Sequence, residues 1–189
     1  MNGNLAFEES WEELLDGRMV DMSPRPAFNH NVVAFNIARL FANHLRGRRC
    51  IAIADGTDLY LTEKDRFVPD MMVVCDRDKI KTDGVHGTPD LVVEVLSPST
   101  AQNDRGYKKS AYESCGVREY WIVSPNERSV EQYLLYQDHL VLNAIYTVYP
   151  DFMLEKMSEA ERACVVTQFK CSLYDDLIIS LDDIFDNMI

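Results

Sequence analysis

The stretch PDLVVEVLSPST, residues 89–100, places one carboxylate inside an otherwise apolar segment. Glu94 lies between Leu91-Val92-Val93 and Val95-Leu96, and such a β-branched run is typical of a strand that is buried on both faces. An ionised carboxylate removed from water costs several kcal/mol unless a cation or hydrogen bonds compensate it. The sequence therefore predicts a covered sheet and a partner for Glu94 elsewhere in the chain.

Length and composition favour one globular domain spanning residues 1–189, with 47% hydrophobic and 26% charged residues. No apolar run approaches the roughly 18 residues of a membrane span, and the acidic start MNGNLAFEESWEELL is unlike a signal peptide. We therefore expect a cytoplasmic protein that does not enter a membrane. The five cysteines form no Cys-x-x-Cys pair, so we expect free thiols, and the four histidines form no zinc-protease pattern.

The net charge of −12 counts against nucleic-acid binding, because the phosphate backbone is bound by Lys and Arg. The charge is unevenly distributed along the chain. Residues 22–54 contain five arginines and no acid, whereas residues 151–189 contain nine acids and three bases. Charge alone leaves two interpretations open: a basic face for a polyanion, or a solvated helix end with an acidic solubilising tail.

Several elements are expected ahead of the Glu94 strand. An acidic helix at 8–15, a turn at Asp16-Gly17 and a strand within 18–22 come first. A helix follows Pro26, where Asn29 can provide the cap. Its buried face is expected to comprise Val33, Ile37, Leu40, Phe41 and Leu45. Further strands are expected at 50–54, at 57–62 and at 67–76, the last opened by Pro69, before a polar loop at 77–88.

Two of these strands begin with the same dipeptide, Pro-Asp, at 69–70 and 89–90. If the strands pair, Asp70 and Glu94 converge, and Asp90 shares the face of Glu94 because side chains alternate along a strand. Clustered carboxylates repel one another, and a hard divalent cation such as Mg²⁺ stabilises them. Asp90 can alternatively cap the loop before its strand.

The residues after the Glu94 strand predict a helix that ends at Gly116, with capping-box spacing between Ser99 and Gln102. A strand, VREYWIV, follows and ends before Pro125. The order strand, helix, strand predicts a crossover that lays the helix over the sheet carrying Glu94.

Within this helix Asp104, Lys108 and Tyr112 share one face at spacings of four residues. Taken alone, this spacing favours a surface Asp–Lys pair beside a packing tyrosine. With the helix over the sheet, Lys108 can instead reach the carboxylates.

These motifs together resemble the bacterial restriction-endonuclease-like proteins, a branch of the PD-(D/E)xK nuclease superfamily. The resemblance runs through nearly the whole chain, from LLDGRMVDMSP through FVPD, PDLVVEVLSPST and DRGYKKSAYESCGVREYWIVSP to LDDIF. It implies an α/β (α+β) fold with a mixed β-sheet flanked by helices. It also implies a metal-dependent endonuclease that hydrolyses DNA phosphodiester bonds.

The resemblance further implies that Asp70 and Glu94 are catalytic and hold Mg²⁺ or Mn²⁺, with Asp90 as a further ligand or support. The superfamily's lysine, two residues after the acid, is replaced here by Leu96. In this family the following helix supplies the lysine, which matches Lys108. The neighbouring Lys109 points about 100° away around the helix.

Three further residues of the resemblance have supporting roles. Asp104 and Tyr112 flank Lys108 on the helix face, and Tyr112 is expected to pack against it. His30 resembles a recurrent family position, for which we expect a capping or structural role.

Other functions stay open from the sequence. A catalytically inactive, nuclease-derived nucleic-acid-binding or regulatory protein would be consistent with Leu96 and with the net charge of −12. A buried Lys or Arg could also neutralise Glu94 in an inert ion pair. We expect a homodimer, with the apolar stretch YLLYQDHLVLNAIYTVY as its interface, although a hairpin packed on its own core explains this stretch equally well.

Overall fold

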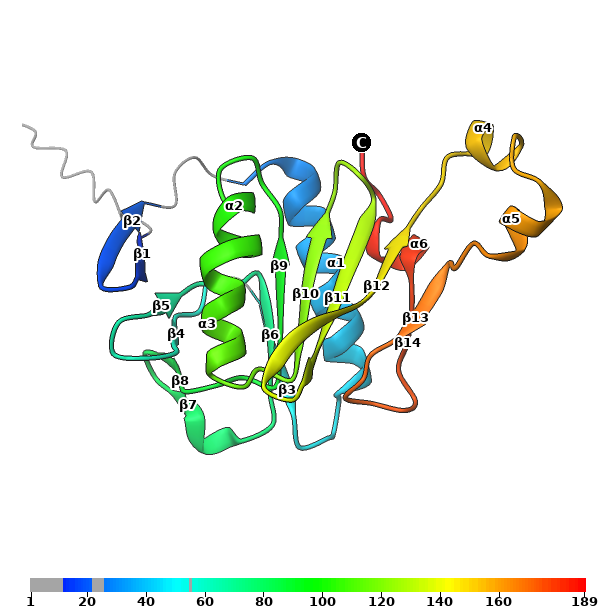
Figure 1. Ribbon diagram of the computed structural model, residues 1–189. Coiled ribbons are helices and arrows are strands. Elements are labelled where there is room, and N and C mark those ends of the chain that lie inside the picture. The colour runs from blue at the N-terminus through cyan, green and yellow to red at the C-terminus, as the bar shows by residue number, and fades with distance from the viewer. Residues whose placement is uncertain (1–11, 22–25, 55) are drawn as a thin grey trace, which may run out of the picture.

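The computed structural model describes residues 12–21, 26–54 and 56–189, and two six-stranded mixed sheets form its framework (Figure 1). Helices flank the larger sheet, which confirms the expected α+β fold class. The strand order in the larger sheet is β12 (His139–Thr147), β11 (Ser129–Tyr136), β10 (Glu119–Ser124), β9 (Leu91–Val95), β6 (Met71–Val74) and β3 (Ile51–Ala54).

The predicted strand around Glu94 is β9, and all five of its residues are buried. It lies between β10, which runs parallel to it, and β6, which runs antiparallel. Alternate side chains of β9 enter two different cores: Val93 contacts the one that includes helix α1, and Val92 the one that includes helix α3. The central position with both faces covered explains the uninterrupted apolar sequence.

Helix α1 (Phe28–His44) covers one face of the larger sheet (Figure 1). The predicted buried face is confirmed, with Leu40 packed at its margin. The predicted cap is wrong, because Ala27 is the N-cap residue and Asn29 lies inside the first turn. The Asn29 side-chain amide instead donates to the carbonyl oxygen of Ile189 at 2.8 Å, so it ties the two segments together.

The predicted acidic helix is wrong over residues 12–15, which form strand β1 (Glu12–Leu15). It pairs in a hairpin with β2 (Arg18–Asp21), which is the strand predicted after the turn. Asp16 and Gly17 both have positive φ angles, the conformation of a type I′ turn, which matches the twist of the paired strands. Residues 8–11 and 22 of these predictions lie outside the described residues.

The second sheet is built from very short strands. The predicted strand at 67–76 is divided between the sheets, because its start belongs to the second sheet and Pro69 lies between the two parts. The predicted loop at 77–88 contains a 3-10 turn and two strands. The strand order is β2, β1, β5 (Arg66–Phe67), β4 (Leu59–Tyr60), β8 (Gly84–His86) and β7 (Ile80–Lys81), with η1 (Arg77–Lys79) before β7.

The helix predicted after β9 lies over the other face of the larger sheet (Figure 1). It comprises α2 (Ala101–Asn103), a π-helical turn η2 (Asp104–Lys108) and α3 (Lys109–Ser114). The predicted capping box is wrong, since Thr100 is the N-cap residue and its hydroxyl lies 3.1 Å from that of Ser97. The predicted stop is confirmed: Gly116 has a φ of 81°, which favours glycine.

The C-terminal segment adds α4 (Asp151–Leu154), α5 (Glu159–Ala163), the hairpin of β13 (Gln168–Lys170) and β14 (Ile178–Ser180), and α6 (Leu181–Ile184). This hairpin packs on the larger sheet, where Phe169 stacks on Tyr146 with ring centroids 4.3 Å apart. The fully buried Glu119 accepts hydrogen bonds from the Gln132 amide and the Ser172 backbone N–H, so it joins β10 and β11 to the hairpin.

The prediction of five free thiols is wrong for two of them, because Cys50 and Cys75 form a disulfide. Cys50 precedes β3 and Cys75 follows β6, and the antiparallel pairing of these strands places them opposite each other. A cross-strand pair separated by 25 residues leaves no spacing signature in the sequence. Within the described ranges, none of the helices has the length and apolar character needed to span a membrane.

Candidate active site

Three buried carboxylates surround the ammonium group of Lys108, and a fourth, Asp70, lies near one of them. Lys108 Nζ lies 2.8 Å from Glu13 Oε1, 3.2 Å from Glu94 Oε1 and 3.5 Å from Asp104 Oδ1. Asp70 is close enough that its charge raises the pKa of Glu94. The cluster is almost sealed from solvent, because the least buried member, Asp70, is only 9% exposed.

Strand register brings Asp70 to Glu94, as the sequence predicted. Met71 lies opposite Val93 in the antiparallel β6–β9 pair. Asp70, just before β6, therefore lies opposite Glu94. Asp70 Oδ2 accepts a 2.6 Å hydrogen bond from the backbone N–H of Val95, and Asp70 Oδ1 lies 3.3 Å from His30 Nε2. His30 is therefore a neighbour of Asp70 in the buried part of α1 and not a helix cap.

The π-helical turn η2 contributes both Asp104 and Lys108 to the cluster. The two residues are only 1% and 2% exposed, so the alternative of a surface Asp–Lys pair is wrong. The crossover places this helix against β9, which turns the shared face inward. Isolated π-helical turns are rare and occur frequently at functional sites.

Glu13, on β1, is a member of the cluster that the sequence analysis missed. Its Oε1 accepts a hydrogen bond from the Val68 backbone N–H at 2.9 Å in addition to the ion pair with Lys108. The sequence does contain a signal for this strand, since Asp16-Gly17 between two apolar segments is typical of a hairpin. Recognising the hairpin would have placed Glu13 on a sheet, although not next to Lys108.

Two buried tyrosines fix the cluster from the side of α3 and β10. The hydroxyl of Tyr112 donates to Glu94 Oε1 at 2.7 Å, and that of Tyr120 donates to the carbonyl oxygen of Asp104 at 3.0 Å. Tyr112 thus contacts the acid directly, beyond the packing role expected for it. Burial, together with the nearby charge of Glu94, raises the pKa of Tyr112 well above its usual value, so the hydroxyl remains a donor.

The electrostatics of the cluster are dominated by burial. Burial raises the pKa of Glu94 well above its ordinary value; Lys108 opposes this shift, and the neighbouring acids add to it. Burial also raises the pKa of Asp104, against the attraction of Lys108. Burial alone would lower the pKa of Lys108, but the surrounding carboxylates outweigh it and raise the pKa, so the ammonium stays charged.

Asp90 lies immediately before β9 and uses its oxygens away from the cluster. Oδ2 accepts a 2.7 Å hydrogen bond from the Cys75 backbone N–H, and Oδ1 lies 2.6 Å from Arg118 Nη2. This geometry corresponds to the alternative in which Asp90 secures the start of its strand. Leu96 packs at the margin of the core on the α3 side, and Lys109 Nζ lies 4.9 Å from the centre of the Tyr133 ring, away from the acids.

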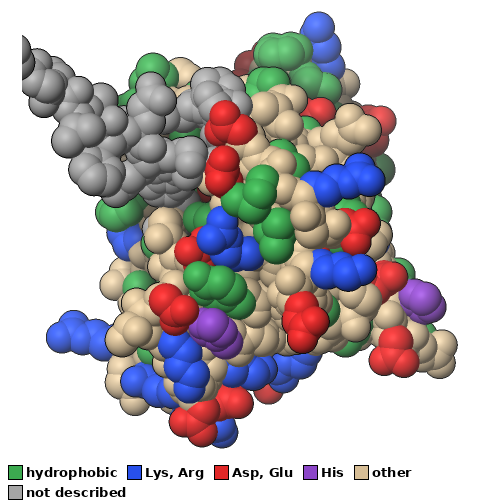
Figure 2. All heavy atoms as spheres, turned by 90° about the vertical axis from the view of Figure 1, so that its left-hand side faces the viewer, with side chains coloured by type: hydrophobic (Ala, Val, Ile, Leu, Met, Phe, Trp, Pro, Cys, Tyr) green, Lys and Arg blue, Asp and Glu red, His purple; other side chains and the backbone are tan. Residues whose placement is uncertain are grey.

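The arginines at the end of α1 do not border this cluster. Arg46, Arg48 and Arg49 follow a helix whose first turns contain His30, and the rise of 1.5 Å per residue separates the two ends by about 25 Å. Arg48 is paired with Asp176 at 2.6 Å. On the face that carries the second sheet, basic and acidic side chains are interspersed (Figure 2). Arg25 lies outside the described residues.

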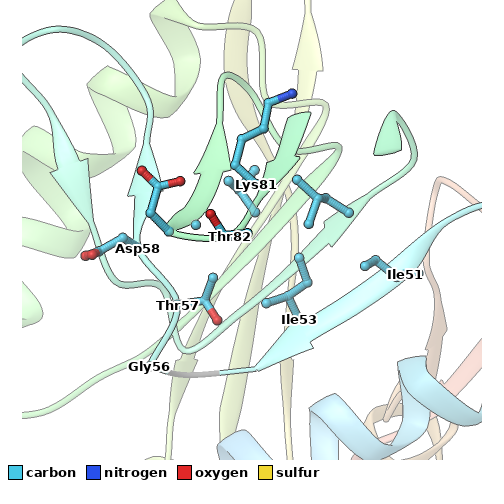
Figure 3. A pocket seen from close by; sticks show the side chains of 11 residues that line it. Ile51, Ile53, Gly56, Thr57, Asp58, Lys81 and Thr82 are labelled. Carbon is cyan, nitrogen blue, oxygen red and sulfur yellow. The ribbon is translucent and has the colours of Figure 1, made fainter. Parts of the chain in front are cut away.

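A shallow pocket of about 390 Å³ lies between β3 and the β7–β8 hairpin, with Ile51 and Ile53 on one side and Lys81 and Thr82 on another (Figure 3). None of the predicted site residues lines it. The buried acids are therefore a separate feature from this pocket.

The mixed sheets, with a buried acid pair on adjacent strands and a lysine from the crossover helix, define a protein of the restriction-endonuclease-like class. The chain belongs to the Uma2 family, described as "Putative restriction endonuclease", whose model matches residues 7–158.

Two relatives and one solved structure are similar to this chain. An uncharacterized protein of Synechocystis sp. is 36% identical over 124 residues, and a second from the same organism is 28% identical over 125 residues. These matches cover 64% of this chain in both cases, and 64% and 70% of the relatives, so the chain spans less than two thirds of the first relative's length. A crystal structure from Anabaena variabilis, titled "putative nuclease belonging to DUF820", shares the fold, with a TM-score of 0.68, 19% identity and coverage of 92% and 89% of the two chains.

Proposed function

We propose that this protein is a metal-dependent endonuclease that hydrolyses phosphodiester bonds of DNA. The observation that carries the proposal is the buried cluster in which three carboxylates face a single ammonium group and Asp70 lies beside Glu94. An excess of buried negative charge is costly unless a further cation balances it. Family membership supports the nuclease class, and the metal and the DNA substrate are inferred from the chemistry of the cluster.

The donor set fits a hard divalent cation. Asp104 Oδ1 is buried and is 3.5 Å from Lys108 Nζ, but it accepts no hydrogen bond within the described part of the chain, so the cluster has acceptor capacity that its own donors do not use. Mg²⁺ and Mn²⁺ prefer carboxylate and water oxygens. Asp70 and Glu94, on adjacent strands, would hold the ion. When bound, such an ion lowers the pKa of a coordinated water and polarises the phosphodiester.

The remaining residues of the cluster would position the reacting groups. Lys108 carries the charge suited to orienting the attacking water or offsetting negative charge that develops on the phosphate. Glu13 and Asp104 hold its ammonium group, and Tyr112 fixes the rotamer of Glu94. The π-helical turn thus supplies the lysine that is missing at position 96, where this chain has a leucine.

A second function class is favoured by one observation. Lys108 already pairs with Glu94, as an inert structural ion pair requires, and in residues 12–21, 26–54 and 56–189 no three His, Cys, Asp or Glu side chains converge as ready metal ligands. A nuclease-derived nucleic-acid-binding or regulatory protein without turnover would have this arrangement. Metal binding distinguishes the two classes.

The first experiment is calorimetric titration of Mn²⁺ into the wild-type protein and Glu94→Gln, with and without an oligonucleotide. We expect binding by the wild type and its loss in the folded variant. Asp90→Asn is the matched control just before the same strand, and it should retain binding because its oxygens contact Cys75 and Arg118. A wild-type protein that binds no Mn²⁺ even with the oligonucleotide would establish the inert ion pair instead.

The second experiment compares DNA cleavage by Lys108→Ala and Lys109→Ala, two adjacent lysines of which only Lys108 reaches the acids. We expect Lys108→Ala to lose about a hundredfold or more in rate, the usual effect of removing a transition-state contact, and Lys109→Ala to stay near the wild type. Circular dichroism checks that both variants fold. Equal rates for the two variants would contradict the assigned role of Lys108.

A further inference from the structure

Strand β12 is an exposed edge of the larger sheet. This strand, His139–Thr147, has nine residues and stands at the end of the strand order. Its residues 140–147 include no Asp, Glu, Lys or Arg. Proteins usually protect such edges with charges or prolines, because the unpaired backbone groups can pair with another strand. A bulge interrupts its pairing with β11. Glu113 accepts the Leu140 N–H, so among the described residues a side chain covers only the start of this edge.

Exposed apolar side chains are concentrated on and beside this edge. Val141, Leu142 and Ile145 lie on β12 itself. Tyr136 precedes the strand, and Phe152 and Met153 follow it in α4. Exposed apolar side chains gathered on one segment mark interaction sites more often than isolated ones do.

The segment that follows β12 is not buried by any part of the chain that the structure describes. Helices α4 and α5 have four and five residues, and none of these residues is buried. Helices this short are marginal in water without tertiary contacts. Figure 1 shows that the segment projects away from the two sheets. An external surface that packs against it would explain why it is helical.

A second copy of the chain suits this edge in both charge and geometry. With a net charge of −12, two copies repel each other over most of their surfaces, and an uncharged strand is where they can approach. Antiparallel pairing about a two-fold axis places the end of one β12 beside the start of the other. The α4 segment of each copy, with Phe152, then reaches the exposed Tyr136 of the other, so the same apolar groups serve both copies.

We propose that β12 and the α4–α5 segment form a homodimer interface in which two copies join their larger sheets edge to edge. Main-chain hydrogen bonds between the two β12 strands provide the pairing, and the exchanged α4 segments cover the apolar side chains beside it. The interface is independent of the buried acids.

Sedimentation velocity of the wild type, Ile145→Lys and Ile178→Lys tests this interface. The two isoleucines are matched, because each lies on a strand and is 57% exposed, but Ile178 is on β14, in the separate two-stranded sheet. We expect the wild type and Ile178→Lys to sediment at twice the chain mass of 21.7 kDa. Ile145→Lys should weaken dimerisation about tenfold or more, because it places a charge on the apolar edge that pairing would remove from water.

Phe152→Asp provides a second variant, since this exposed side chain on α4 can be changed without affecting the core. We expect it to weaken the dimer while leaving the far-UV circular dichroism unchanged. A wild-type protein that is monomeric throughout the micromolar range would overturn the proposal and favour a different partner. A dimer equally strong in Ile145→Lys and Ile178→Lys would overturn it as well.

Discussion

At the scale of single residues, one buried acid organises the candidate site. Glu94 receives a hydrogen bond from Tyr112 and an ion pair from Lys108, so the partner required by the sequence exists. The acids around Lys108 nevertheless leave the cluster with excess negative charge. This imbalance has a consequence for stability that can be measured without any substrate.

The pH dependence of stability follows from the raised pKa of Glu94 and Asp104. The folded protein holds these protons more tightly than the unfolded chain, so their contribution to stability is complete below the ordinary values of 4.5 and 3.8 and is lost as pH rises through the folded-state values. In EDTA, we expect the free energy of unfolding to fall more steeply as the pH rises from about 5 towards neutrality in the wild type than in Glu94→Gln.

Urea unfolding at each pH measures this difference, with Glu63→Gln as the control because Glu63 is exposed. Parallel curves for the wild type and Glu94→Gln would show that Glu94 has an ordinary pKa. The raised pKa of Lys108 has the same sign but acts at alkaline pH, so it does not contribute within this window.

The sequence predicted part of the residue-level picture. Asp70, Glu94 and Lys108 were predicted to converge because repeated Pro-Asp dipeptides and helix spacing report strand starts and helix faces. Glu13 was missed, since its place depends on a hairpin that folds back from a distant part of the chain. The side-chain direction of Asp90 depended on Arg118 and Cys75, which no local pattern connects to it.

At the scale of elements, local periodicity was most informative for long, buried segments. The interior of α1 and the strands β9 and β10 follow the predicted patterns, because their burial is continuous. Helix caps and the boundary between β5 and β6 were predicted wrongly. Several neighbouring hydroxyls can occupy the cap position before α2, and between β5 and β6 the chain passes from one sheet to the other. The disulfide joins two elements that the sequence predicted separately, β3 and β6.

Thiol titration tests the disulfide directly. In denaturant without reductant we expect three reactive thiols, those of Cys115, Cys164 and Cys171, and after reduction all five. Replacing Cys50 and Cys75 by alanine should lower the free energy of unfolding by about 3 kcal/mol, because a loop of this length gains entropy in the unfolded chain. Five reactive thiols before reduction would contradict the assignment.

At the scale of the whole molecule, charge and site are arranged unfavourably for DNA unless a cation intervenes. The protein has a net charge of −12, and the arginines beyond α1 lie far from the acids. The pairing of two sheets could not be predicted from sequence, because the strands β4, β5 and β7 of the second sheet have only two residues each. Periodicity over two residues carries no signal.

We therefore expect Mn²⁺ to increase the affinity for a duplex oligonucleotide about tenfold or more, since it neutralises carboxylates that otherwise repel phosphate. Fluorescence anisotropy in EDTA and in Mn²⁺, at matched ionic strength, measures the change. Asp70→Asn should bind better than the wild type in EDTA because it removes one of these charges. Equal affinities for the wild type under both conditions would contradict this expectation.

The β13–β14 hairpin, which Glu119 connects to the larger sheet, sets a lower limit on the length of any fragment of this chain that can fold. The family match ends at residue 158, yet Phe169, Ile179 and Phe185 belong to the core that α1 covers. A fragment designed to stop at the family boundary would expose that core to solvent and deprive Glu119 of its donor at Ser172. We expect such a fragment to aggregate during expression, so the unit that folds is larger than the unit that the family shares.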